Sequence, residues 1–200
     1  MTTRRLPRKS LQTALLALFI NLIVVGSVSA ESSKSTKFQN IKIKNFGQMD
    51  ERFYRGAQPQ EGDYESLAAL GIKTIIDLQD EPTSYEKRAA ESAGMRYVNI
   101  PMSDSKRPSD SQIEQFLKLA NDPETGAFFV HCKGGRHRTG VVGAVYRLQN
   151  GWDFDKVYKE MKDYDYYSRW GHGELKDYVE DYSGHLKSIV VSTGASSSSK

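Results

Sequence analysis

The side chain best suited to covalent chemistry is Cys132, the only cysteine in the 200-residue sequence. It lies between an apolar run at residues 127–130, typical of a buried strand, and a second apolar run at residues 141–148, suited to a buried helix. Gly134 and Gly135 occupy the turn between the two runs. A glycine-rich turn that opens a helix can direct backbone N–H groups and the positive end of the helix dipole at an anion. We therefore expect a phosphate-binding loop.

The spacing within this loop favours nucleophilic catalysis. Five residues separate Cys132 from Arg138, so the thiol and the guanidinium can face one bound anion, with the guanidinium contacting two of its oxygens. A thiol pKa of about 8.5 falls to about 3.5–7.5 at a helix N-terminus beside cations, which predicts a thiolate nucleophile at neutral pH. Thr139 can donate a hydrogen bond to that thiolate and help it leave in a second step.

Residues 131–140 follow the pattern His-Cys-x-x-Gly-x-x-Arg-Thr-Gly. This pattern resembles the signature of cysteine-dependent protein tyrosine and dual-specificity phosphatases. A short strand ending in Arg55-Gly-x-Gln-Pro59 also resembles the entry segment of their bacterial and atypical members. The resemblance covers roughly residues 53–182 and implies a phosphoric monoester hydrolase that forms a cysteinyl phosphate. The loop lacks Gly-x-x-x-x-Gly-Lys-Ser/Thr, which excludes an NTP-binding loop of that type.

The mechanism also needs an acid that protonates the departing oxygen and later activates water. In the family that the chain resembles, this acid is an aspartate on a mobile loop, which corresponds here to the loop at residues 101–108 and makes Asp104 the candidate. Asp80 and Glu81, after the preceding strand, are alternatives, and Asp110 is better placed to support a helix N-terminus. The loop has no Trp-Pro-Asp tripeptide of the receptor-like tyrosine phosphatases.

Three further side chains in the loop could carry positive charge, namely those of Lys133, Arg136 and His137. Lys133 and Arg136 occupy positions where tensin-like phosphoinositide phosphatases carry lysines, and the stretch is similar to loops of plant and fungal atypical phosphatases acting on inositol pyrophosphates. The phosphate-binding set is therefore expected to be Lys133, Gly134, Gly135, Arg136, His137 and Arg138, with His131 in support.

These residues leave more than one function open. The main prediction is a protein tyrosine or dual-specificity phosphatase, and the alternative is an inositol (poly)phosphate or phosphoinositide phosphatase on the same scaffold. A non-catalytic phosphate-binding module, a sulfur-transfer enzyme with a Cys-x5-Arg loop, and a cysteine that is only a small buried hydrophobe are further alternatives. The substrate partner is accordingly a phosphorylated protein or an inositol phosphate. The four histidines are scattered and there is no second cysteine, so we expect neither a metal site nor a cofactor.

The first thirty residues resemble a secretory signal peptide. Arg4, Arg5, Arg8 and Lys9 precede an apolar run, and Val28-Ser-Ala30 is a small-residue cleavage site. Export to the periplasm or the exterior, without stable membrane insertion after cleavage, is the expectation, and an uncleaved membrane anchor is the alternative. Removal of residues 1–30 leaves 24 basic against 25 acidic residues, so the charge does not favour nucleic-acid binding.

Beyond the signal, residues 31–37 are expected to form a flexible leader, residues 38–187 the phosphatase domain, and residues 188–200 a disordered serine-rich tail. The oligomeric state has no signal in the sequence.

Helix and strand patterns alternate along the domain. An edge strand or hairpin arm is expected at 38–46, buried strands at 72–78, 95–100 and 127–130, and helices at 63–70, 84–93, 110–120, 141–148, 153–161 and 174–182. Ser109 and Gln112 form a capping box for the helix at 110–120. The alternation predicts a single α/β domain with a central, mostly parallel sheet flanked by helices, with a fold like that of the dual-specificity phosphatases. The phosphate loop would lie at the carboxyl end of the last central strand.

Overall fold

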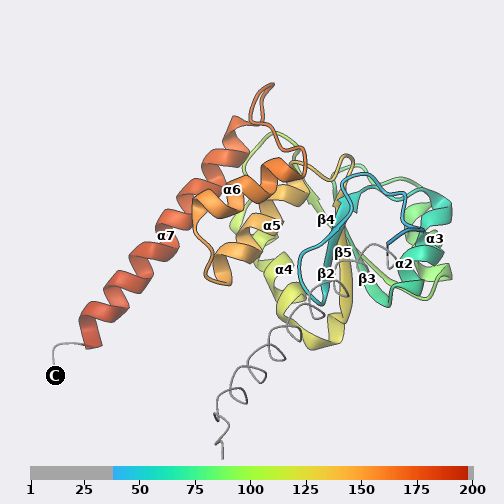
Figure 1. Ribbon diagram of the computed structural model, residues 1–200, viewed down its shortest axis with the longest axis horizontal. Helices are drawn as coiled ribbons and strands as arrows, with labels where there is room; N and C mark the ends of the chain where they lie inside the picture. The colour runs from blue at the N-terminus through green and yellow to red at the C-terminus, as the bar shows by residue number, and fades with distance from the viewer. Residues whose placement is uncertain (1–37, 198–200) are drawn as a thin grey trace, which may run out of the picture. The chain divides into compact units, whose positions relative to one another are not determined.

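The computed structural model describes residues 38–197, with side chains described through Ile189 and at Ser192 (Figure 1). The predicted signal peptide and leader, residues 1–37, lie outside this part. One compact unit begins at Asn40 and contains all the helices and strands given below. Within the described residues, no helix has both the length and the apolar character that crossing a membrane requires.

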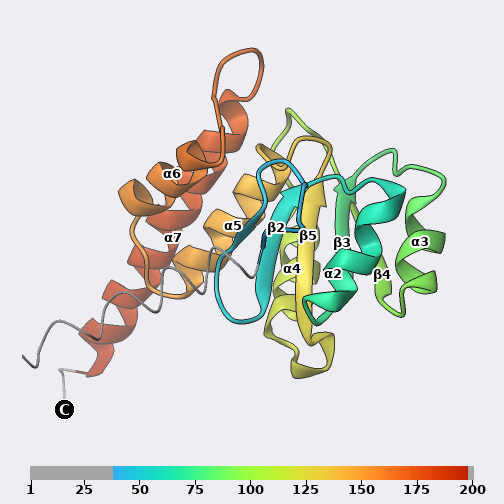
Figure 2. The ribbon, with the colours of Figure 1, turned by 45° about the vertical axis from the view of Figure 1, so that its right-hand side comes forward.

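A five-stranded sheet in the order β1-β2-β5-β3-β4 forms the centre of this unit (Figure 2). The strands are β1 (Gly47–Gln48), β2 (Phe53–Ala57), β3 (Ile72–Gln79), β4 (Arg96–Met102) and β5 (Ala127–Cys132). β1 pairs with β2 in the antiparallel direction, and all other neighbours are parallel. The prediction of a central, mostly parallel sheet in an α/β domain is confirmed.

The helices cover both faces of this sheet. They are η1 (Glu61–Asp63), α2 (Tyr64–Ala69), α3 (Glu86–Ser92), α4 (Asp110–Asn121), η2 (Pro123–Thr125), α5 (Arg138–Gln149), α6 (Phe154–Asp163) and α7 (Gly173–Ser197). The capping box predicted for α4 is present, with Gln112 N–H donating to Ser109 Oγ and the Gln112 side chain accepting from Ser109 N–H. α6 and α7 contact α5 on its side away from the sheet (Figure 1).

Side chains of β5 alternate between two environments because successive residues of a strand point to opposite faces. Val130 and Cys132 belong to the core cluster with Phe116 of α4 and Val142 of α5. His131 points the other way and meets Glu86 of α3. The strand therefore presents its cysteine and its histidine to different layers of the molecule.

The edge strand or hairpin arm predicted at residues 38–46 is wrong, because these residues contain no strand and the short strand β1 begins only at Gly47. Strand pairing is confined to the two residues of β1, because the chain turns just before them, where Asn45 has a φ of +54°. Asparagine tolerates this left-handed conformation, and the Asn45 side-chain amide donates to the Gly134 carbonyl at 2.8 Å. The chain just before β1 therefore contacts the phosphate loop and stabilises its position.

The last helix is longer than predicted. We expected residues 174–182 to be helical and residues 188–200 to be disordered, whereas α7 runs from Gly173 to Ser197. Leu175, Val179 and Leu186 continue one apolar face of this helix against α5 and α6. This face, together with the absence of proline from the segment, lets the helix continue into the serine-rich sequence.

Candidate active site

The phosphate loop joins the end of the central strand β5 to the start of α5. Cys132 is the last residue of β5 and Arg138 the first of α5, so the predicted spacing is realised as a strand, a short loop and a helix. Gly135 has a φ of +65°, and a Cβ atom there would overlap the backbone of Gly56 and Ala57 in the neighbouring strand β2. Only glycine lets the loop pass so close to β2.

A cavity of about 270 Å³ opens above this loop. It is lined by Asp104, Cys132, Lys133, Gly134, Arg136, His137, Arg138, Tyr167 and His172. The structure thus brings together most of the residues singled out in the sequence. Of the others, Thr139 is buried beneath the cavity, and Gly135 and His131 support the loop without lining it.

The environment of Cys132 favours the charged form of its thiol. Burial alone would raise the pKa of the thiol, but hydrogen bonds from the hydroxyl and backbone of Thr139 outweigh it. The charge of Arg138 and the backbone N–H of Gly134 act in the same direction, so the pKa lies below its usual value. The Thr139 hydroxyl is buried and has no oxygen or nitrogen partner within the described residues.

The Arg138 side chain is hydrogen-bonded to groups at the carboxyl ends of the neighbouring strands β3 and β4. Its Nη1 donates to the Met102 carbonyl at 3.0 Å and to Asp80 Oδ1 at 2.7 Å. Its Nε is buried and has no partner among the described residues. The hydrogen bonds of Nη1 fix the plane of the guanidinium. The unpartnered Nε–H can donate to an anion in the cavity.

The same contact decides against Asp80 as the acid. The hydrogen bond from Arg138 holds the pKa of Asp80 below its usual value and occupies one oxygen of this carboxyl, so Asp80 is better suited to orient the guanidinium than to donate a proton. Glu81 does not line the cavity. Asp104 does line it, and its carbonyl lies 2.8 Å from Nδ1 of His172.

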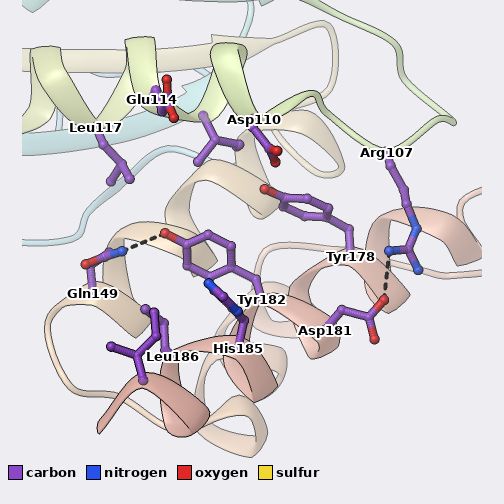
Figure 3. Close-up of a pocket in the computed structure, with 12 residues that line it drawn as sticks. Arg107, Asp110, Glu114, Leu117, Gln149, Tyr178, Asp181, Tyr182, His185 and Leu186 are labelled. Atoms are coloured by element: carbon purple, nitrogen blue, oxygen red, sulfur yellow. Dashed lines mark hydrogen bonds and ion pairs between the residues drawn. The ribbon is translucent and has the colours of Figure 1, made fainter. Parts of the chain in front are cut away.

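Asp110 lies in a different hollow, a groove of about 510 Å³ between α4 and α7 (Figure 3). Arg107 and Asp181 form an ion pair at 2.7 Å on one side of it, and Gln149 donates to the Tyr182 hydroxyl at 2.6 Å on the other. No residue of the phosphate loop lines this groove, which makes the smaller cavity the site of the cysteine chemistry.

The segment between α6 and α7 forms a wall of the site that the sequence did not predict. His172 stacks on His137 with ring centroids 3.6 Å apart, and Tyr167 meets the His137 ring edge-on at 4.5 Å. The sequence alone does not decide whether His172 lies at the site or on the surface, and it assigns no role to the nearby tyrosines. The only signal was an aromatic-rich stretch at residues 164–172, which does not reveal what it packs against.

The charge of the loop differs from the prediction at one position. Burial, followed by the nearby His172, lowers the pKa of His137 to about 4, so this ring is neutral at pH 7. The third positive charge expected at His137 is therefore absent at this pH. Lys133 is exposed, and Arg136 lies 3.6 Å from Asp165.

One set of ionisable groups has the composition of a metal site. Ligand atoms of Asp77, Glu86 and His131 lie within 4.8 Å of one another, and all three side chains are fully buried. This cluster lies on the opposite face of the sheet from the thiol.

Comparisons with known proteins agree with this geometry. A family model described as "DSP-PTPase phosphatase fused to NAD+ Kinase" matches residues 19–174. A "Probable tyrosine-protein phosphatase DG1060" of Dictyostelium discoideum is 30% identical over 124 residues, which cover 59% of this chain and 74% of the relative. "Inositol diphosphatase DSP4" of Arabidopsis thaliana is 29% identical over 124 residues, covering 59% of this chain and 62% of that one, less than two thirds of its length.

The crystal structure of TpbA from Pseudomonas aeruginosa superposes with a TM-score of 0.60 at 24% identity, covering 69% of this chain and 84% of that one. This likeness shows the fold.

Proposed function

Because the chain belongs to the dual-specificity-type cysteine phosphatases, we propose that its cavity hydrolyses phosphoric monoesters through a cysteinyl phosphate on Cys132. One observation carries the proposal: separate segments bring a thiol with a lowered pKa, a guanidinium with an unpartnered N–H, and a carboxyl to the same cavity. A pure binding site has no need of a charged nucleophile beside an anion.

In the first step, the Cys132 thiolate attacks phosphorus and the phosphorus–oxygen bond to the leaving group breaks. Asp104 gives its proton to the departing oxygen, so an alcohol or phenol leaves. Arg138 and the inward N–H groups of the loop bind the phosphoryl oxygens, on which negative charge accumulates.

In the second step, water attacks the phosphorus of the cysteinyl phosphate. Asp104, now ionised, removes a proton from this water, and the sulfur–phosphorus bond breaks. Inorganic phosphate forms and the thiolate is regenerated. The Thr139 hydroxyl, which faces the sulfur, stabilises the departing thiolate by a hydrogen bond.

For the substrate, we propose a phosphorylated tyrosine, or serine or threonine, of a protein. Support comes from the family model and from the relative described as a tyrosine-protein phosphatase. The second candidate is an inositol polyphosphate, favoured by Lys133 and Arg136 beside Arg138 at the cavity and by the relative described as an inositol diphosphatase.

We also propose that the enzyme acts after export. The support is the signal-like sequence of residues 1–30 together with a single cysteine, which has no internal partner for a disulfide in an oxidising compartment. Expression of the full chain followed by N-terminal sequencing of the exported protein tests this. A mature N-terminus at Glu31 is expected, and a chain that keeps residues 1–30 in the membrane fraction contradicts it.

The substrate proposal is tested by phosphate release from a phosphotyrosine peptide and from inositol hexakisphosphate in parallel, with Cys132→Ser as the blank. Faster release from the peptide per enzyme is the expected result. Preference for the inositol phosphate would assign Lys133 and Arg136 to substrate binding. No release from either substrate, or from p-nitrophenyl phosphate, would overturn the catalytic proposal and favour a binding module.

A further inference from the structure

One buried charge beside the phosphate loop takes no part in the two chemical steps. Arg55 of β2 is 1% exposed, and none of the ion pairs among the described residues includes it. Burial lowers the pKa of its guanidinium to about 10, so the group still carries its charge at neutral pH. A buried charge without a paired counter-charge is costly, and its presence here therefore needs a reason.

The Arg55 guanidinium is held between an aromatic ring and the phosphate loop. Its Cζ atom lies 4.0 Å from the centre of the Tyr164 ring, which is a cation–π contact. Its Nη2 donates to the Gly135 carbonyl at 2.6 Å. A Cβ atom at Gly47 of β1 would overlap the Tyr164 hydroxyl, so the ring is packed closely against the sheet. Arg55 is thus a donor in a fixed position next to the loop.

A second side chain binds the carbonyl of the preceding glycine. The amide of Asn45 donates to the Gly134 carbonyl at 2.8 Å, and Asn45 is half-buried with a φ of +54°. Two consecutive peptide groups of the loop therefore have their carbonyl oxygens bound by side chains from a segment far away in the sequence.

These two hydrogen bonds also decide where two backbone N–H groups point. In a planar trans peptide, the carbonyl of one residue and the N–H of the next point in opposite directions. The bond to Gly134 thus turns the N–H of Gly135 away from Asn45, and the bond to Gly135 turns the N–H of Arg136 away from Arg55. Neither N–H has a hydrogen-bond partner in the described part of the chain. Both can therefore donate to an anion in the cavity, which Gly134 and Arg136 line.

We propose that Arg55 and Asn45 are positioning residues, which hold two consecutive peptide groups of the phosphate loop so that the N–H groups of Gly135 and Arg136 bind the phosphoryl oxygens. A turn with two glycines needs such support, because glycine adopts positive and negative φ about equally readily. The charge of Arg55 strengthens binding further, because an anion in the cavity provides the counter-charge that the buried guanidinium lacks.

The proposal rests on the proposed function for the kind of anion, but binding can be measured without turnover. The probe is tungstate, a tetrahedral oxyanion, and its Kd is obtained by isothermal titration calorimetry. Arg55→Met keeps a long side chain and removes the donors and the charge. We expect its Kd to be about 10–100-fold higher than that of wild type, because a hydrogen bond to a charged group is lost.

Backbone amide signals in NMR spectra show which peptide group has lost its orientation. When tungstate is added to wild type, the amide protons of Gly135 and Arg136 should move downfield as they form hydrogen bonds. In Arg55→Met, the response of Arg136 should be lost and that of Gly135 kept. Asn45→Gly should give the reverse result, and glycine tolerates the left-handed backbone of this position. A purely structural role would not separate the two signals.

Arg52→Met is the matched control. Arg52 also donates to backbone carbonyls, those of Asp122 and Gly126, but it lies just before β2, at the end of this strand away from the phosphate loop. This variant should keep the wild-type Kd for tungstate and both amide responses.

Wild-type Kd values and amide responses in both Arg55→Met and Asn45→Gly would overturn the proposal. Equal loss of both responses in each variant would also overturn it, because the loop would then be displaced as a whole. If Arg55→Met does not fold, Asn45→Gly decides alone, and an unchanged Gly135 response refutes the proposal. If the wild-type protein binds tungstate with both amide responses but releases no phosphate from any substrate, the proposed function fails while the positioning roles stand.

Discussion

Asp104 and Asp80 are two carboxyls near one phosphate site, and their surroundings separate their roles. Asp80 is tied to Nη1 of Arg138, which holds its pKa low, whereas Asp104 lines the cavity through a different loop. We therefore assign proton transfer to Asp104 and orientation of the guanidinium to Asp80.

We predict that Asp104→Asn lowers kcat on an alkyl phosphate by about 10²–10⁴-fold, because a poor leaving group depends on protonation. Hydrolysis of p-nitrophenyl phosphate, whose leaving group is a stable anion, should fall much less. Steady-state rates on both substrates, with Asp110→Asn as the control variant, measure the difference. Equal losses on the two substrates would remove the acid role from Asp104.

At the scale of elements, the segment between α6 and α7 connects the acid loop to the phosphate loop. Nδ1 of His172 lies 2.8 Å from the Asp104 carbonyl, and its ring stacks on His137. The same segment places Tyr164 under the Arg55 guanidinium at 4.0 Å, and Arg55 in turn donates to the Gly135 carbonyl. It thus contacts the loop directly at His137 and supports it at Gly135 through Arg55.

We predict that His172→Ala reduces kcat on alkyl phosphates by about 10–100-fold, because small displacements of a catalytic group are costly. His172→Asn should recover part of the loss, since an amide N–H can reach the Asp104 carbonyl as Nδ1 does. Trp170→Ala, at an 88% exposed position of the same segment, is the control. The assignment fails if His172→Ala and Trp170→Ala have the same kinetics on both classes of substrate.

For the whole molecule, the half-buried His137 of the site links stability to pH. The pKa of His137 is about 4 in the folded protein and about 6.5 in the unfolded chain, so the unfolded state binds more protons between these values. Its contribution to the free energy of unfolding is therefore fully present above pH 6.5 and is lost as the pH falls towards 4.

We predict that His137→Asn flattens the decline of the melting temperature between pH 6.5 and 4 relative to wild type. His185→Asn, at an exposed position of α7, should retain the wild-type slope. Thermal unfolding at several pH values measures this. Identical slopes in wild type and His137→Asn would mean that His137 does not titrate as described.

Much of this molecule was predictable from local sequence. The loop from Cys132 to Arg138 combines a strand, a glycine turn and a helix, each with its own short-range signal, and the capping box of α4 is equally local. The contacts that were missed join residues far apart in the chain, such as His172 with Asp104 and Glu86 with His131. Such pairings depend on how helices pack, which periodicity does not encode. The same holds for Asn45. Alternating apolar and polar residues predicted a strand there, whereas the Asn45 side chain forms a hydrogen bond with Gly134 of the phosphate loop.

The central claim is a phosphoryl group carried on the sulfur of Cys132. Acid quenching of the enzyme during turnover of a phosphotyrosine peptide, followed by mass spectrometry of the proteolytic fragment that contains Cys132, tests it directly. We expect one added phosphoryl group on this fragment in wild type and none in Cys132→Ser, which should also release no phosphate. Phosphate release by Cys132→Ser, or a phosphoryl group on another residue during turnover, would contradict the account.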